Sequence, residues 1–197
     1  MTLRRSINIL LLATTCTVFG KSAVAADYEI DIPGMHAAIQ FRILHLGYSV
    51  LTGRFNDFSG SFTWDPDNPG AASINVTVQT ASIDSNHAER DKHLREEDFL
   101  NVAKYPEATF ASTQYNGDAN SGTLEGILTL HGVSKPIAID VTFIGEGDDP
   151  WGGYRAGFEG SVTIRRSDFG MMYDLGPKSD EMQLDLYIEG CRDTCQK

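Results

Sequence analysis

Much of the chain alternates between apolar and polar side chains with a period of two residues. The alternation is clearest in five stretches, residues 28–32, 74–78, 137–143, 158–164 and 182–188. Because successive side chains of a β-strand point to opposite faces of a sheet, such a stretch buries one face and exposes the other to water. The pattern therefore predicts strands over most of the chain.

Clusters of turn-forming residues separate these stretches. They lie at residues 65–70, 116–118, 132–136 and 145–150, and the cluster at 132–136 is typical of a tight hairpin. We count about eight strands with mostly local connections, which indicates an antiparallel meander. Such a sheet protects its edges by closing into a barrel. We therefore predict an all-β fold, an eight-stranded antiparallel barrel.

One segment departs from the period of two. Residues 84–100 are rich in charged residues and good helix formers, and Asp84 or Ser85 is placed to cap the start of a helix. Leu94 and Phe99 are the apolar side chains that we expect to face the barrel. We predict a short helix and a loop that lie over one end of the barrel.

The first 25 residues differ in composition from the rest. Two arginines give a basic start, residues 7–19 are mostly apolar, and Ala23 and Ala25 supply small residues where cleavage is specified. The apolar run is shorter than the roughly 20 residues that cross a bilayer. We predict a signal peptide cleaved after Ala25, or after Ala26, and a single mature domain, residues 26–197, in the periplasm without stable membrane insertion.

The charge of the mature chain excludes some partners. The whole sequence has 16 basic and 27 acidic residues, and the three basic residues of the signal peptide leave a mature net charge of -14. Binding to nucleic acid rests on clustered basic residues, which neutralise phosphates. We therefore expect no nucleic-acid partner and no docking on an anionic membrane surface.

Two cysteines remain in the mature chain, Cys191 and Cys195. In an oxidising compartment we predict that they form a disulfide across a very short loop. The alternative is a pair of incidental surface cysteines. Because the pair lies near the end of the chain, such a bond constrains little of the fold.

The interior of an eight-stranded barrel is either filled by side chains or hollow around one small ligand. Phenylalanines are common core fillers, so side-chain physics alone favours a filled barrel. A soluble carrier of a long lipid needs an apolar tube, which a barrel also supplies. The inward residues that would line such a pocket are Phe41, Ile43, Phe58, Phe62, Phe110, Leu128, Phe158, Ile164 and Phe169. These assignments follow the alternation, and a register shift of one residue would reverse whole strands.

His45 continues the inward face of Ile39, Phe41 and Ile43. It is placed to form a hydrogen bond with the polar end of a ligand, and the alternative is a core histidine bonded to the backbone. The sequence contains no zinc-binding spacing of histidines and cysteines and no nucleophile or phosphate-binding motif. We expect no enzyme activity, no metal and no cofactor. A hydrolase with paired carboxylates is the enzymatic alternative.

A series of short motifs resembles the YceI family. They include His45-Leu46-Gly47-Tyr48-Ser49 and run, in order, through residues 28–31, 41–43, 45–49, 53–55, 58–60, 86–94, 98–100, 126–136, 148–153, 155–159 and 168–170. Each motif is weak alone, but their order and spacing cover nearly the whole mature chain. The Cys191 and Cys195 tail lies outside this pattern.

The resemblance implies a lipocalin-like barrel in the periplasm that binds polyisoprenoids or other long amphiphiles. It also implies links to base or osmotic stress and to isoprenoid quinones, and it brings no catalytic residues. An uncharged head group such as a quinone fits the acidic chain better than a polyprenyl phosphate. The residues that could form a local basic exception are Arg42, Arg54, Arg90, Arg165 and Arg166.

The main hypothesis is thus a periplasmic carrier of a long-chain isoprenoid lipid. A filled barrel that binds a protein partner, in connection with stress, is the second hypothesis, and the hydrolase is the third. The sequence leaves a homodimer open.

Overall fold

The computed structural model describes residues 25–192 and Cys195. The predicted signal peptide, residues 1–25, lies outside the described residues except for its last position. Within the described part of the chain, no helix has the length and hydrophobicity needed to cross a bilayer.

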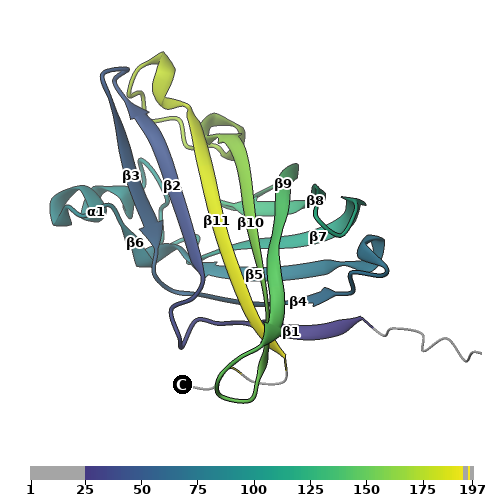
Figure 1. Ribbon diagram of the computed structural model, residues 1–197. Helices are drawn as coiled ribbons and strands as arrows, with labels where there is room; N and C mark the ends of the chain where they lie inside the picture. The colour runs from purple at the N-terminus through teal and green to yellow at the C-terminus, as the bar shows by residue number, and fades with distance from the viewer. Residues whose placement is uncertain (1–24, 193–194, 196–197) are drawn as a thin grey trace, which may run out of the picture.

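An 11-stranded antiparallel sheet curls into a barrel (Figure 1). Its strand order is β1-β4-β5-β7-β8-β9-β10-β11-β2-β3-β6, and the additional pairing of β1 with β11 closes the ring. The strands are β1 (Ala26–Ile30), β2 (Ala38–His45), β3 (Ser49–Phe55), β4 (Phe58–Trp64), β5 (Ser73–Gln79), β6 (Ile83–Asp84), β7 (Glu107–Gly117), β8 (Ser121–Leu130), β9 (Val133–Asp148), β10 (Tyr154–Arg165) and β11 (Glu181–Arg192).

These strands occupy eight positions around the barrel. Strands β7 to β11 are continuous, whereas each of the first three positions holds two consecutive segments. Strands β1 and β2 together form the first position, because β1 pairs with the C-terminal part of β11 and β2 pairs with its N-terminal part. In the same way β4 and β3 form the next position, and β5 and β6 the third. The predicted eight-stranded antiparallel barrel is therefore confirmed.

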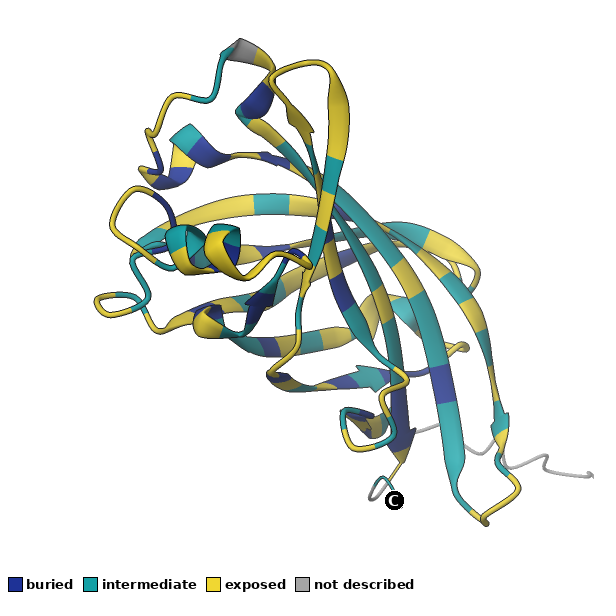
Figure 2. Cartoon of the chain, turned by 90° about the vertical axis from the view of Figure 1, so that its left-hand side faces the viewer, coloured by how far each residue is buried: buried dark blue, intermediate teal, exposed yellow. Residues whose placement is uncertain are grey.

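The alternation in the sequence corresponds to the two faces of this sheet. Across β10 and β11, Val162 lies opposite Leu184 and Ile164 opposite Met182, and all four side chains line the interior. Figure 2 shows buried or half-buried bands alternating with exposed bands along many of the strands. The stretch predicted as 28–32 ends at Ile30 instead, because Asp31 turns out of the strand and its carboxylate accepts a hydrogen bond from the Gly34 amide.

One predicted turn is misplaced. Residues 145–148 continue β9, and the chain reverses at residues 149–153, where the Asp149 carboxylate accepts hydrogen bonds from the Trp151 and Gly153 amides. The glycines at 145 and 147 therefore lie within a strand. The turns at residues 118–120 and at His131–Gly132 lie at or beside the predicted positions.

The single α-helix of the described residues, α1 (Ala88–Leu94), falls inside the predicted segment but starts later. His87 caps it, because its Nδ1 accepts a hydrogen bond from the Arg90 amide. Asp84 belongs to β6, and Ser85 donates its amide hydrogen to the Asp91 carboxylate at 2.8 Å. The expected caps Asp84 and Ser85 were therefore wrong, since both residues precede the cap and Ser85 fastens the helix from outside.

Within residues 25–192, four short 3-10 helices lie in the connections. They are η1 (Pro69–Ala71), η2 (Thr80–Ser82), η3 (Arg166–Phe169) and η4 (Pro177–Ser179). The last two form the link from β10 to β11. The Ser179 hydroxyl donates to the Leu44 carbonyl at 2.7 Å, so this link packs beside the β2–β3 hairpin.

Candidate functional site

The barrel encloses a cavity of about 470 Å³. Its wall is mainly aliphatic and aromatic, and all eight strand positions contribute to it. Cavities of this size and character are typical of small-molecule binding sites. The barrel is therefore not filled throughout, and the cavity is the candidate site.

Aromatic side chains pack across one end of the interior. Trp64 of β4 stacks on Phe143 of β9 with 5.6 Å between ring centroids, and its ring also meets Phe158 of β10 edge to face at 5.0 Å. Tyr28 stacks on Phe62 at 4.8 Å in the same cluster. Because β4 lies across the barrel from β9 and β10, these rings join opposite walls and fill the interior there.

We call the other end of the cavity the mouth; its lining includes the polar side chains of His45, Arg90 and His93. It is bordered by the β2–β3 hairpin, by helix α1 and by the link from β10 to β11. Leu44 and His45 contribute from the hairpin, His93 from the helix and Tyr173 from the link. The His93 and Tyr173 rings lie 5.4 Å apart, which brings helix and link together. A ligand with an apolar tail and a polar head fits with its head at this end.

Most of the pocket residues expected from alternation line the cavity: Phe41, Ile43, His45, Phe62, Phe110, Leu128, Phe158 and Ile164. Phe58 and Phe169 do not line it. Phe58 is buried in the cluster that contains the stacked aromatic rings. Phe169 lies in η3, where it is 1 % exposed and packs in a buried cluster with cavity-lining residues such as Phe41 and Ile164. For these two residues the expectation is corrected, because burial in packed core replaces contact with the cavity.

His45 lies at the mouth as an exposed side chain rather than deep in the barrel. It ends β2 opposite Ser49. The alternation predicted its inward direction, but it could not indicate that the strand ends there.

Several residues that line the cavity were not predicted from the sequence. Trp64 and Tyr115 lie at the aromatic end, and Leu175 and Tyr173 come from an irregular link without the period of a strand. For Trp64 a signal existed, because it lies two residues after Phe62 on the same strand face.

Two arginines line the cavity near the mouth. Arg166 is buried, and its guanidinium donates to the backbone carbonyls of Ser179, Met171 and Tyr173. Burial lowers the pKa of Arg166, and the nearby charge of Asp180 opposes that shift. Arg90 donates to the hydroxyl and the carbonyl of Ser85. Both cations are therefore engaged by protein oxygen atoms.

A charged cluster lies outside the barrel, near its aromatic end. Arg155 donates to Asp31, Asp149 and Glu189, and His36 Nδ1 lies 2.8 Å from the Asp31 carboxylate. Burial alone would raise the pKa of Asp31, but hydrogen bonds from Arg155, His36 and the Gly34 amide bring it below its usual value. The Gly153 amide and Arg155 lower the pKa of Asp149.

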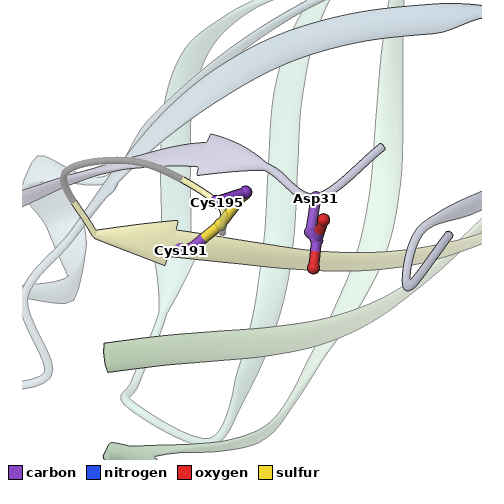
Figure 3. Close-up of side chains that lie close together, drawn as sticks. All are labelled: Asp31, Cys191 and Cys195. Carbon is purple, nitrogen blue, oxygen red and sulfur yellow. A yellow bond between two sulfur atoms is a disulfide. The ribbon is translucent and has the colours of Figure 1, made fainter. Parts of the chain in front are cut away.

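The charged cluster and the nearby cysteines bring together side chains of the types that bind metals, but these groups already have partners within the protein. Asp31, His36 and Glu189 place ligand atoms within 4.8 Å of one another, but the Arg155 guanidinium already lies between them. Cys191 and Cys195 form a disulfide beside Asp31 (Figure 3). Their sulfur atoms are bonded to each other and so are not offered as thiolate ligands.

The chain matches the model of a known protein family. The model of the YceI-like domain matches residues 28–190. A UPF0312 protein of Pseudomonas aeruginosa (strain LESB58) is 56% identical over 190 residues, which cover 96% of this chain and 99% of the relative.

Two solved structures have similar folds. The YCEI protein of Campylobacter jejuni is 32% identical, with a TM-score of 0.68 over 77% of this chain and 91% of that chain. A protein described as a polyisoprenoid binding domain from Saccharophagus degradans has a TM-score of 0.62 and 16% identity, and the match covers 84% of this chain and 98% of that chain. At that identity the likeness establishes a shared fold.

Proposed function

The chain belongs to the YceI family, and from this premise we propose that it is a periplasmic binding and carrier protein, which holds a long-chain isoprenoid lipid inside its barrel. The observation that carries the proposal is the apolar cavity between the mouth and the aromatic end. The description of the Saccharophagus degradans relative in fold as polyisoprenoid-binding supports the same ligand class.

An isoprenoid chain gains most from such an interior. Each buried CH₂ is worth about 0.8 kcal/mol, so a five-carbon isoprene unit is worth roughly 3–4 kcal/mol before the cost of ordering it. Several units in the cavity therefore suffice to hold the lipid away from water. The tail points toward the aromatic end in this arrangement, and the head lies at the mouth.

We propose an uncharged head group, such as a quinone. The guanidinium groups of Arg90 and Arg166 already donate to protein oxygen atoms, so neither is held ready for a phosphate. The acidic chain also disfavours an anionic head. His45, exposed at the mouth, is the candidate partner for a quinone carbonyl.

The protein acts by holding its ligand and not by catalysis in this proposal. The clustered carboxyl groups Asp31 and Asp149 have lowered pKa values and are paired with Arg155, whereas a general acid needs a raised pKa. Secretion through the predicted signal peptide would place the carrier in the periplasm, where base or osmotic stress perturbs the envelope.

The test is native mass spectrometry of the mature protein isolated from its own periplasm, followed by solvent extraction of bound lipid. We expect one isoprenoid per chain with an uncharged head group. Anionic isoprenoids alone would refute the quinone proposal. An empty protein that also takes up no long-chain isoprenoid in vitro would refute the carrier and favour the partner-binding alternative.

A further inference from the structure

The mouth of the cavity carries a group of exposed apolar side chains. Leu44, Leu46, Tyr48 and Val50 of the β2–β3 hairpin are 40%, 50%, 89% and 57% exposed. Met172 and Tyr173 of the β10–β11 link are exposed as well. We call these six residues the apolar rim. Single exposed apolar residues are ordinary, but a gathered group at one place indicates an interaction site.

The two parts of the rim are held together and adjoin the cavity. The Ser179 hydroxyl bonds the Leu44 carbonyl, and the Lys178 side chain approaches Gly47 at the hairpin turn. Leu44 and Tyr173 are at once rim residues and part of the cavity wall. The rim is therefore continuous with the entrance that a lipid would use.

The backbone at the hairpin tip favours a different residue from the one present. Leu46 has φ 53° and Gly47 has φ 80°, and the Tyr48 amide donates to the His45 carbonyl at 3.0 Å. This is the pattern of a type I′ turn, in which asparagine and glycine are preferred because side chains rarely adopt positive φ. Leucine at this position is strained and half-exposed, and backbone strain of this kind tends to lie at functional sites.

The charge and shape of the tip favour a lipid bilayer as the partner of the apolar rim. Residues 43–53 contain no acidic residue, although the chain has 27. Figure 2 shows the hairpin as an exposed projection. A bilayer accepts a projecting apolar tip, and tyrosine prefers the level of its head groups.

We propose that the apolar rim docks on the surface of an uncharged lipid bilayer, so that the isoprenoid passes between membrane and cavity without crossing water. The inference rests on the proposed function, because it assigns the membrane as the donor and acceptor of the ligand. Lys178 and Asp174 of the link balance each other in charge, so docking depends on apolar insertion rather than on anionic lipid.

The test is flotation of the mature protein with phosphatidylcholine vesicles, at low and at high salt. The rim variant combines Leu46→Asn and Tyr48→Ser, and asparagine suits the positive φ at position 46. The matched control combines Ile144→Asn and Trp151→Ser, which remove two apolar side chains that are also exposed, at the opposite end of the barrel. We expect at least tenfold weaker vesicle binding for the rim variant, less than twofold change for the control, and little effect of salt.

A second measurement separates docking from lipid binding. Native mass spectrometry of the same preparations reports whether the cavity holds lipid, and transfer of ubiquinone from donor to acceptor vesicles reports exchange. The rim variant should keep lipid that is already bound but transfer it at least tenfold more slowly. Lipid-loaded wild-type protein that does not float, or a rim variant that floats and transfers as well as wild type, would overturn the docking inference and leave the carrier intact. If the protein floats with vesicles but never contains lipid, the proposed carrier function would instead be refuted.

Discussion

Neighbouring residues on β8 face opposite sides of the wall. Leu128 lines the cavity, whereas Ile127 is exposed on the outer surface. We predict that Leu128→Trp fills part of the cavity and weakens isoprenoid binding at least tenfold, because the larger ring occupies space that the tail needs. Binding is measured by fluorescence titration with a ubiquinone analogue.

The matched variant is Ile127→Trp, which adds the same ring to the outside of the same strand. It should bind the ligand as tightly as wild type. Equal affinity in both variants would mean that the ligand does not occupy the cavity.

At the scale of residues, the sequence predicts which way a side chain points better than it predicts what surrounds that side chain. Alternation placed Phe41, Ile43 and Leu128 on the cavity wall, because inward direction follows from strand periodicity alone. It could not distinguish a cavity-lining residue from one packed in the core, as Phe58 is, and it does not apply to Phe169, which lies in η3 outside the strands. That distinction depends on how far opposite strands stand apart, a property of the whole barrel.

Among the elements, helix α1 depends on a buried carboxylate. Asp91 is 7% exposed and accepts hydrogen bonds from the amide and hydroxyl of Ser85. Asp91→Ala leaves these donors without their partner, so we predict a loss of about 1–3 kcal/mol in the free energy of unfolding. Urea titration of the purified variant measures it.

Glu89→Ala is the control, because Glu89 is exposed on the same helix. Its effect should stay within about 0.5 kcal/mol. A similar loss in both variants would show that the lost negative charge in the first turn of the helix, and not the Ser85 contacts, accounts for the change.

The existence of the strands and the helix follows from the sequence, but several of their ends do not. Glycines at 145 and 147 favour a turn locally, yet β9 continues through them because β10 pairs alongside. The helix begins after His87 rather than after Asp84, because pairing of Asp84 with Arg54 draws it into β6. In both cases contacts between distant strands override local preference.

For the whole molecule, stability should fall in acid. The pKa values of Asp31, Asp84, Asp118, Asp149 and Asp180 are all lowered from 3.8. A carboxyl group with a lowered folded-state pKa stabilises the fold above its unfolded pKa, and that contribution is lost as the pH falls through the folded value. We therefore predict a melting temperature that is steady from about pH 7 to 5 and drops below about pH 4.

Asp31→Asn isolates the largest expected contribution, since Asp31 is buried and paired with Arg155. The variant should melt lower than wild type at neutral pH, and the two curves should converge in acid. Glu181→Gln, which removes an exposed ion pair with Arg165, should follow wild type throughout. An Asp31→Asn curve parallel to that of wild type would contradict the assignment.

The pairing of β11 with β1 and β2 closes the barrel, and it determines when during folding the barrel can close. Of the strands in the described residues β11 is synthesised last, and until it forms, β1 and β2 lack the partner strand that closes the barrel. Joining segments so distant along the chain is the slowest kind of contact to form, because a long loop must first close. Before then the sheet is open, and its edge strands are unpaired. Closure of the barrel therefore waits for β11, and under the proposed function a lipid that lies against the open sheet at that moment would be enclosed.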